Sequence, residues 1–456
     1  MGKAARRAAS LAGALGAAPV SRPTAIVIGG GLAGLSASVA LAQHGWQVTL
    51  LESKQRLGGR AGSFRDPATG ELIDACQHVS MGCCTRFAEF CRTVGIDPLL
   101  APQKSLYFMT PDRRVSRFSA DPLPAPLHLA RSFLGAHFLT LGEKWRIAVA
   151  LHRLVKEPAE SDGSFAEWLA ARKQTRRIID RFWSVVLVSA LNAPIDRIGL
   201  KYARKVFLDA FWRDRRGFDV QIPVVPLDRL YGEELRSWFD RHDVAIQLSS
   251  SVAALTFRAR RVESVMLRNG KRLTADALIS AVPPDRLLAL LPTELAAEPA
   301  FTDLRRFEFA PITSVHLWFD RPATDLPHVV FVDCLSQWLF QRGGNYIQVV
   351  VSAAHELAGL STEQIEERVV AELTDLFPNL VGAQRLRSKV VTERAATFSP
   401  VPGVDQWRPG ATTPVANLFL AGDWTATNWP ATMESAVISG ENAASAATRS
   451  LRSGAR

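Results

Sequence analysis

A glycine-rich segment between two short apolar runs near the start of the chain constrains the fold more than any other feature. Ala25–Ile28 is a β-branched apolar run long enough for a buried parallel strand, and Gly29, Gly31 and Gly34 follow it with G-x-G-x-x-G spacing. A stretch of helical composition comes next, and a second apolar run then ends at Glu52. Strand, glycine turn, helix and strand in this order predict a βαβ unit that binds a dinucleotide.

Each of these residues has its own task in such a unit. Gly29 allows a tight turn, Gly31 lets the backbone approach a pyrophosphate, and Gly34 lets the helix pack against the strand. The helix N-terminus directs free N–H groups at the phosphates. Glu52 lies near the spacing of about 20 residues expected for a carboxylate that accepts from ribose hydroxyls, which disfavours NADP. An ordinary glycine-rich turn is the alternative interpretation.

A second glycine-rich segment separates FAD from NAD. Gly58, Gly59 and Arg60 follow the ribose acid, and this pattern resembles the second fingerprint of the FAD-dependent amine oxidase and carotenoid desaturase superfamily. In that superfamily the segment wraps the pyrophosphate and approaches the flavin. The resemblance therefore implies FAD as the cofactor, with a plain Gly-Gly turn as the alternative.

A third segment near the end of the chain resembles the C-terminal flavin segment of the same superfamily. A buried strand runs into Gly422 and Asp423, and a loop leads to a helix of small residues that begins near Met433. The resemblance implies that Asp423 accepts from the ribityl hydroxyls and that backbone groups of Val252 contact the adenine. The Met433 end of the helix would direct N–H groups at the flavin N1–C2=O edge, which favours reduced, anionic flavin.

Composition limits the classes of partner. A chain of 456 residues, 47% of them hydrophobic, suggests roughly two or three domains with a large core. The net charge of +10 fits anionic membrane, nucleic acid or simple solubility, and nucleic acid is disfavoured because no basic run is interleaved with aromatic residues. No apolar segment reaches the ~20 uncharged residues that span a bilayer.

The cysteines argue for a reducing compartment and against a metal site. Their number, five, is odd in a large chain, which favours free thiols. Four of them follow the spacing C-x6-C-C-x6-C between positions 76 and 91, unlike the paired spacing of zinc sites. We therefore expect no metal.

The order of these segments predicts an α/β protein in which a Rossmann-like FAD-binding domain of the GR2 type is interleaved with a substrate domain of mixed sheet and helices. The FAD-binding domain is expected to take three parts of the chain: 24–98, 221–300 and 401–447. The substrate domain is expected to take 99–220, as a helical, membrane-facing part, and 301–400, as a sheet. Residues 1–23 are expected to form a flexible leader, with a weak secretory or twin-arginine signal as the alternative, and 448–456 a tail.

Two stretches of the substrate domain bear on access to the flavin. Residues 127–155 combine an aromatic-rich apolar face with arginines and lysines, which suits an interfacial helix, although packing within the domain is the alternative. Residues 181–192 are almost uncharged, which predicts a fully buried helix beside an apolar tunnel.

A narrower resemblance rests on the stretch that follows the second fingerprint. Gln77-His78 after Asp74, together with Phe182-Trp183 and His316-Leu-Trp-Phe-Asp320, is similar to the squalene-associated FAD-dependent desaturases, the hydroxysqualene dehydroxylases. The similarity covers residues 24–447. It implies that hydroxysqualene loses its hydroxyl and accepts hydride from reduced flavin to give squalene.

Ionisation of an allylic alcohol needs an acid for the leaving oxygen and an apolar pocket for the cation. We expect His78 to donate the proton and Asp74 to orient it, with a structural histidine as the alternative. Cys76 departs from the family, in which glycine is common there. Two other enzymes remain open, a carotenoid or apocarotenoid desaturase and a flavin amine oxidase, and so does a non-catalytic flavoprotein scaffold.

The expected substrate sets the expected location. An isoprenoid hydrocarbon partitions into lipid at about 0.8 kcal/mol per buried CH₂. We therefore expect a peripheral enzyme on the cytoplasmic, inner face of the membrane, drawn by its basic charge to anionic lipid. Its expected partners are the isoprenoid lipid, the membrane surface and enzymes of squalene synthesis.

Overall fold

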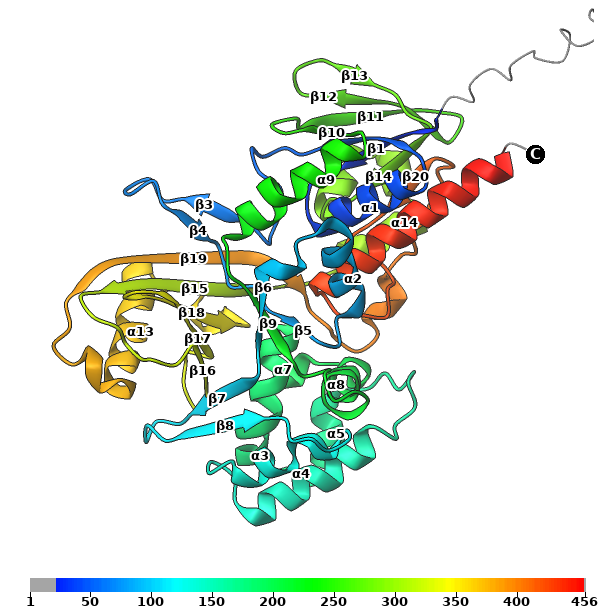
Figure 1. Cartoon of the computed structure of the whole chain (residues 1–456). Helices are drawn as coiled ribbons and strands as arrows, with labels where there is room; N and C mark the ends of the chain where they lie inside the picture. Colours follow the sequence, from blue (N-terminus) through cyan, green and yellow to red (C-terminus); the bar gives the residue numbers. More distant parts are fainter. Residues whose placement is uncertain (1–21, 455–456) are drawn as a thin grey trace, which may run out of the picture.

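A five-stranded parallel sheet forms one end of the protein in the computed structural model, which describes residues 22–454 (Figure 1). Nearly all of the expected leader lies outside the described residues. The strand order is β10-β2-β1-β14-β20, and every neighbouring pair is parallel. The strands are β1 (Thr24–Ile28), β2 (Gln47–Leu51), β10 (Val244–Gln247), β14 (Ala277–Ser280) and β20 (Leu418–Leu420). Three distant parts of the chain therefore build one sheet.

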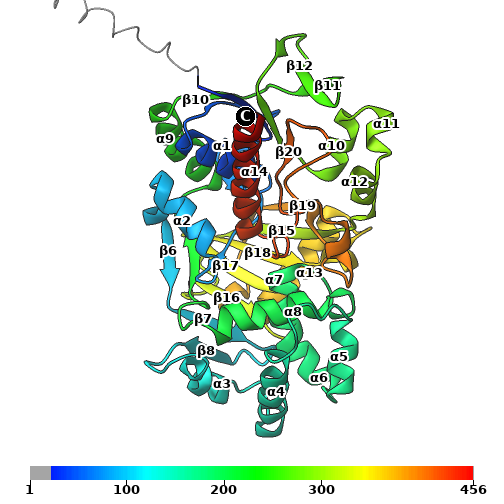
Figure 2. The ribbon, with the colours of Figure 1, turned by 90° about the vertical axis from the view of Figure 1, so that its right-hand side faces the viewer.

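Two helices of small residues run side by side over this sheet (Figures 1 and 2). Helix α1 (Leu32–Gln43) is buried along most of its length, and α14 (Met433–Gly454) lies against it. A Cβ atom on Gly440 would lie only 2.3 Å from the carbonyl oxygen of Ala33. Close approach of backbones explains why both helices are rich in alanine, serine and glycine.

A seven-stranded sheet forms the second layer, in the order β19-β15-β18-β17-β16-β7-β8. Its pairs are antiparallel except for β16 with β7. The strands are β7 (Ser105–Met109), β8 (Val115–Ser119), β15 (Phe309–Phe319), β16 (His328–Phe331), β17 (Trp338–Gly343), β18 (Tyr346–Ser352) and β19 (Arg385–Phe398). Helix α13 (Thr362–Leu376) packs its apolar face here and begins with a capping box formed by Ser361 and Gln364.

Helices form the end of the molecule farthest from the parallel sheet (Figure 2). They are α3 (Ala130–Gly135), α4 (Leu141–Leu154), α5 (Phe165–Ala171), α6 (Arg176–Ile178), α7 (Ser184–Leu191) and α8 (Leu200–Phe207). The sequence predicted a fully buried helix at 181–192, and the prediction of full burial is wrong. A π-helical turn at Ile179–Trp183 leads into α7, where Leu187 and Leu191 are buried but Val185 and Val186 are only half-buried.

Shorter elements connect these layers. They are β3 (Ser63–Arg65), β4 (Leu72–Asp74), β5 (Ser80–Met81), α2 (Thr85–Val94), β6 (Leu100–Gln103), β9 (Val220–Pro223), α9 (Leu235–Arg241), β11 (Val252–Arg258), β12 (Arg261–Leu267), β13 (Arg272–Leu273), α10 (Pro284–Leu290), α11 (Thr293–Ala296) and α12 (Pro299–Thr302). Strand β9 pairs with both β5 and β6, so it joins segments far apart in the sequence. No helix within residues 22–454 has the length and apolar character needed to cross a membrane.

The observed class is the α/β architecture predicted from the sequence. The predicted division into domains differs from the sheet pairing in one respect. Strands β7 and β8, expected within the helical part, are the edge of the seven-stranded sheet, because Val330 and Phe331 of β16 pair in parallel with Phe108 and Met109.

Candidate cofactor site

The first glycine turn has no room for a side chain at Gly29 or Gly34. Gly29 has φ of +108°, and a Cβ atom there would lie 2.8 Å from the carbonyl oxygen of Ala281. A Cβ atom on Gly34 would lie 1.9 Å from the carbonyl oxygen of Gly29. The predicted turn and packing tasks of these two glycines therefore match the geometry.

The two glycine-rich fingerprints lie directly beside each other. The Gly58 N–H donates to the Gly30 carbonyl oxygen at 2.8 Å, and Gly31 pairs with Gly58 as a parallel bridge. Gly58 and Gly59 have φ of +93° and +61°. A Cβ atom on Gly31 would meet only the Gly59 Cα within 4 Å, at 3.9 Å, so this backbone faces open space.

That open space fits a pyrophosphate. Gly31 is the N-cap of α1, and no side chain caps the helix there. The first N–H groups of α1 have no partner within the helix and can donate to phosphate oxygens, whereas the N–H groups of Gly29, Gly30 and Gly58 are bonded within the protein and shape the turn. This is the observation by which the residues present fit FAD.

Glu52 lies buried at the end of β2, where the ribose acid was predicted. Its Oε2 accepts from the Gly30 N–H at 2.7 Å, and its Oε1 accepts from the Lys54 N–H at 2.8 Å. The carboxylate thus fixes the glycine turn as well, and its contact with ribose stays a prediction. The Ser250 N–H donates to the Glu52 carbonyl oxygen at 2.8 Å, which places Val252 at the start of β11 near the same end.

An ion pair joins the second fingerprint to the C-terminal segment. Arg60 Nη2 lies 2.7 Å from Asp423 Oδ1, and Arg60 Nη1 donates to the Ala396 carbonyl oxygen at 2.7 Å. The Asp423 carboxylate is almost fully buried. Gly422 precedes it with φ of +146°, and a Cβ atom there would lie 2.3 Å from Trp424 Nε1. The sequence predicted both segments but not their pairing.

Helix α14 begins at Met433 as predicted, and its first turn is held by several polar contacts. The Thr432 hydroxyl accepts from the Ser435 N–H at 3.2 Å, and the Tyr231 hydroxyl lies 3.8 Å from Met433 Sδ. Glu434 faces away to α2, where it accepts from the Arg86 and Phe87 N–H groups at 3.0 and 2.7 Å. Burial raises the pKa of the Glu434 carboxyl in spite of these bonds.

Arg408 organises the loop between β20 and α14, and sequence reasoning missed it. Its side chain is fully buried and donates to the carbonyl oxygens of Asp423 and Trp429 at 3.0 and 2.8 Å. It also donates to the Tyr202 hydroxyl at 2.6 Å. Nothing in the surrounding proline- and glycine-rich sequence distinguishes this arginine from an exposed one.

A second ion pair with a buried carboxylate is formed by Asp74, the residue predicted to orient His78. Asp74 Oδ2 accepts from Arg342 Nη2 at 2.7 Å, while Asp74 Oδ1 accepts from the Ser63 hydroxyl at 2.7 Å and the Leu227 N–H at 2.8 Å. Arg342 Nη1 donates to Gln77 Oε1 at 2.7 Å. None of these contacts is a hydrogen bond between His78 and Asp74, although Asp74 was expected to orient His78. Arg342, which was missed from the sequence, binds that carboxylate instead.

His78 is half-buried on the same segment. Its Nδ1 lies 3.1 Å from the Cys76 carbonyl oxygen. A carbonyl oxygen only accepts, so Nδ1 carries the hydrogen and Nε2 keeps a free lone pair. Burial lowers the pKa of His78, which keeps the ring neutral at pH 7. In this state His78 is suited to accept a proton, whereas we expected from the sequence that it donates one.

An apolar cluster continues from His78 toward the helical end. Its fully buried members are Leu106, Phe218 and Val220, and its half-buried members are Val79, Met81, Phe108, Phe118, Ala120, Leu129, Phe211, Ile222 and Trp338. We call these residues the apolar cluster. Half-buried aromatic side chains at the junction of a sheet and helices can contact a hydrocarbon.

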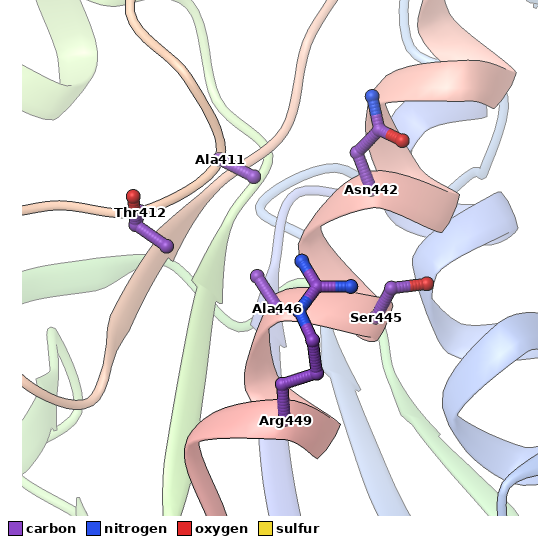
Figure 3. Close-up of a pocket in the computed structure, with 6 residues that line it drawn as sticks. All are labelled: Ala411, Thr412, Asn442, Ser445, Ala446 and Arg449. Carbon is purple, nitrogen blue, oxygen red and sulfur yellow. The ribbon is translucent and has the colours of Figure 1, made fainter.

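Two further features do not belong to this site. A hollow of about 330 Å³ lies along the C-terminal half of α14, lined by Ala411, Thr412, Asn442, Ser445, Ala446 and Arg449 (Figure 3). It contains none of the predicted cofactor residues, so the glycine geometry, not this hollow, locates the cofactor site. Within residues 22–454, no group of three or more metal-ligating side chains gathers, and the five cysteines are free thiols.

Comparison with known proteins places this geometry in a wider context. A family model described as flavin containing amine oxidoreductase matches residues 32–448. The chain is 28% identical to the 15-cis-phytoene desaturase of Synechococcus elongatus, over 92% of this chain and 94% of that protein. It is 25% identical to the zeta-carotene desaturase of Arabidopsis thaliana, over 92% of this chain and 84% of that protein.

Solved structures show the same fold at lower identity. An oxidoreductase from Methanosarcina mazei superposes with a TM-score of 0.72 at 16% identity, covering 91% of this chain and 98% of that one. A triple mutant of putrescine oxidase superposes with a TM-score of 0.70 at 15% identity, covering 94% of this chain and 99% of that one.

Proposed function

Because this chain belongs to the flavin containing amine oxidoreductase family and is a FAD-dependent oxidoreductase, we propose that it desaturates a long isoprenoid hydrocarbon. The surroundings of His78 carry this proposal: the imidazole is neutral, its neighbour Gln77 binds the arginine that pairs with Asp74, and its other neighbour, Val79, belongs to the apolar cluster. The reductive dehydroxylation of hydroxysqualene expected from the motif resemblance becomes the second candidate, since the relatives named above are carotenoid desaturases.

Desaturation needs a proton acceptor and a dry, positioned substrate. The reaction removes a hydride and a proton from neighbouring carbons and leaves a C=C bond between them. Bound FAD supplies the two-electron acceptor. His78 Nε2 holds the proton, because Nδ1 is committed to the Cys76 carbonyl oxygen. The apolar cluster holds the hydrocarbon and excludes water.

The fixed charges near His78 disfavour an amine substrate. An aliphatic amine is a cation at neutral pH, so its site needs a free carboxylate or an aromatic cage. The Asp74 carboxylate is already paired with Arg342, and burial lowers the pKa of His78 in spite of the opposing effect of that carboxylate. An uncharged, apolar substrate suits this environment better.

The Gln77-His78 motif supports the second candidate, the dehydroxylation of hydroxysqualene. The Gln77 side chain accepts a hydrogen bond from Arg342. That reaction needs an acid at the leaving hydroxyl, and a histidine of lowered pKa is a poor acid at pH 7. The proton would then have to come from a group other than a resting His78.

The two candidates run in opposite redox directions, so one anaerobic experiment separates them. Oxidised enzyme mixed with phytoene in lipid is expected to lose its oxidised-flavin absorbance and to form a product with a longer conjugated polyene. If phytoene leaves the flavin oxidised, but hydroxysqualene reoxidises the photoreduced enzyme and yields squalene, the second candidate replaces the first. In a separate aerobic assay, release of peroxide with a polyamine alone, as oxygen reoxidises the reduced flavin, would contradict both.

A further inference from the structure

Exposed apolar side chains gather at the helical end of the molecule. Ten large hydrophobic side chains of the described chain are exposed, and five of them lie between positions 123 and 145: Leu123, Leu127, Leu134, Leu141 and Trp145. We call these five residues the apolar tip. Leu141 is 75% exposed and Trp145 71%, more than any other of the ten. Figure 2 shows α3 and α4 at the end of the molecule opposite the parallel sheet.

The fold holds this tip in place. Thr140 and Glu143 form a capping box at the start of α4, and Lys144 Nζ donates to the Leu134 carbonyl oxygen at 2.6 Å. Leu141 and Trp145 are one helical turn apart, so they share a face of α4. Their exposure is therefore a property of an ordered helix start.

Unpaired positive charge surrounds the apolar tip. Arg131, Arg146, Arg153 and Lys156 are exposed, and within residues 22–454 none of them pairs with a carboxylate. The acidic residue of α4, Glu143, is neutralised by Arg177 at 2.8 Å. This charge is complementary to anionic lipid headgroups.

A small hollow strengthens this complementarity. It measures about 120 Å³ and adjoins Trp145, and its lining includes Arg146, Arg153 and Arg172. Arg172 pairs with Glu157 at 2.6 Å, which leaves Arg146 and Arg153 to supply net positive charge. An indole beside exposed guanidinium groups is the arrangement found where a helix lies in a membrane interface.

The apolar tip is continuous with the apolar cluster. Leu127, in the tip, and Leu129, in the cluster, lie in the same 3₁₀ turn, Leu127–Leu129. The cluster also contains Val79, which follows His78 in the chain. The chain therefore passes from the apolar tip into the apolar cluster within one turn, and another member of the cluster is the sequence neighbour of His78.

We propose that the apolar tip inserts into a lipid bilayer that carries anionic headgroups, with Arg146 and Arg153 at the headgroup level, and that the isoprenoid passes from this bilayer along the apolar cluster. The proposal rests on the proposed function only in that the substrate resides in lipid. The docking surface itself is defined by the tip and its arginines.

Vesicle binding without substrate tests the surface separately from the reaction. The wild-type holoenzyme is expected to sediment with vesicles of phosphatidylglycerol and phosphatidylcholine. The double variant Leu141→Glu/Trp145→Glu is expected to bind at least tenfold more weakly while keeping its flavin content. Arg146→Glu/Arg153→Glu is expected to remove the preference for phosphatidylglycerol over pure phosphatidylcholine.

Matched controls make the test specific. Val381 and Leu386, which are 62% and 60% exposed outside the tip, provide the variant Val381→Glu/Leu386→Glu, which is expected to bind vesicles like the wild type. Equal weakening by this control, or no binding of the wild type, would overturn the proposal. A wild-type dimer without lipid that dissociates in the Leu141→Glu/Trp145→Glu variant would instead assign the tip to self-association.

Activity keeps this proposal distinct from the proposed function. With substrate dispersed in detergent micelles, the tip variant is expected to turn over at the wild-type rate. Loss of vesicle binding with intact turnover in micelles supports the docking surface. Wild-type binding to vesicles without turnover of any isoprenoid would contradict the proposed function and leave the docking surface supported.

Discussion

The molecule has one half around the parallel sheet and another around the seven-stranded sheet. The contacts within the first half differ from the contacts within the second. In the first, backbone meets backbone, and the absent Cβ atoms of Gly34 and Gly58 would lie 1.9 and 2.3 Å from carbonyl oxygens. In the second, polar side chains make the long-range links. Asn192, for example, donates to the Ala310 carbonyl oxygen at 3.1 Å and to Thr397 Oγ1 at 2.8 Å.

The difference follows from what each half has to bind. A pyrophosphate needs backbone N–H groups at close range, and only glycine permits that approach. An apolar substrate instead needs an interior lined by side chains, in which each buried polar group has a partner. Substitutions in the two halves should therefore fail in different ways.

The largest effect is expected from Gly34→Ala. The added methyl would lie 1.9 Å from the Gly29 carbonyl oxygen, so β1 and α1 must separate, which costs several kcal/mol. We expect a protein that purifies without flavin or aggregates, measured as the flavin-to-protein ratio. Gly142→Ala in α4, where a Cβ atom meets nothing within 4 Å, is the control and should keep its flavin. A fully loaded Gly34→Ala variant would contradict the packing argument.

The next effect concerns the ion pair that joins the halves. Arg342→Met leaves the Asp74 carboxylate, 1% exposed, without its charged partner, and loss of one partner of a buried pair costs about 3–5 kcal/mol. Urea unfolding of the holoenzyme should show this loss. Arg321→Met, which breaks an exposed pair with Asp320, should leave the free energy of unfolding almost unchanged. Equal losses of unfolding free energy in the two variants would contradict the argument that the pair with the buried carboxylate matters more than the exposed pair.

The third effect is on turnover. His78→Phe removes the expected proton acceptor and should lower kcat by about 10²-fold or more without loss of flavin. Because burial lowers the pKa of His78, wild-type kcat should be constant around pH 7 and fall only at pH values below the ordinary range of histidine. Stopped-flow measurement of flavin reduction against pH checks both statements. An unchanged rate in His78→Phe would assign this histidine a structural role.

The smallest effect is on stability in acid and belongs to the side-chain half. Burial lowers the pKa values of His316 and His328 to about 4 from 6.5. Between pH 6.5 and 4 the unfolded chain binds more protons than the folded one. Lowering the pH through this window therefore lowers the free energy of unfolding. Each histidine contributes about 1.4 kcal/mol per pH unit at most.

Urea midpoints at pH 7, 6 and 5 measure this dependence. Among residues 22–454, neither ring nitrogen of His328 has a hydrogen-bond partner, and the ring lies near Tyr107 and Trp338. His328→Leu should therefore have a shallower dependence of the midpoint on pH than the wild type. An identical dependence would mean that the pKa of His328 is the same in the folded and the unfolded protein.

Prediction from the sequence succeeded where a backbone conformation demands a particular residue. The G-x-G-x-x-G turn, the Gly58-Gly59 pair and the start of α14 at Met433 were all located correctly, because glycine spacing and a strand–loop–helix order are local signals. Prediction failed for contacts between residues that are far apart in the sequence. Arg342 and Arg408 are decisive in the structure, yet each has an ordinary neighbourhood in the sequence.

The sequence by itself determined the parallel-sheet half and the FAD-binding segments within it, because steric limits on φ and on close backbone approach act within a few residues. Only the tertiary structure decided that Asp74 binds Arg342 instead of His78, and that Leu141 and Trp145 lie exposed at the start of a capped helix. The physical reason is that burial and charge pairing depend on which distant segments meet. That meeting also fixes His78 as a neutral group, since desolvation by the folded chain lowers its pKa.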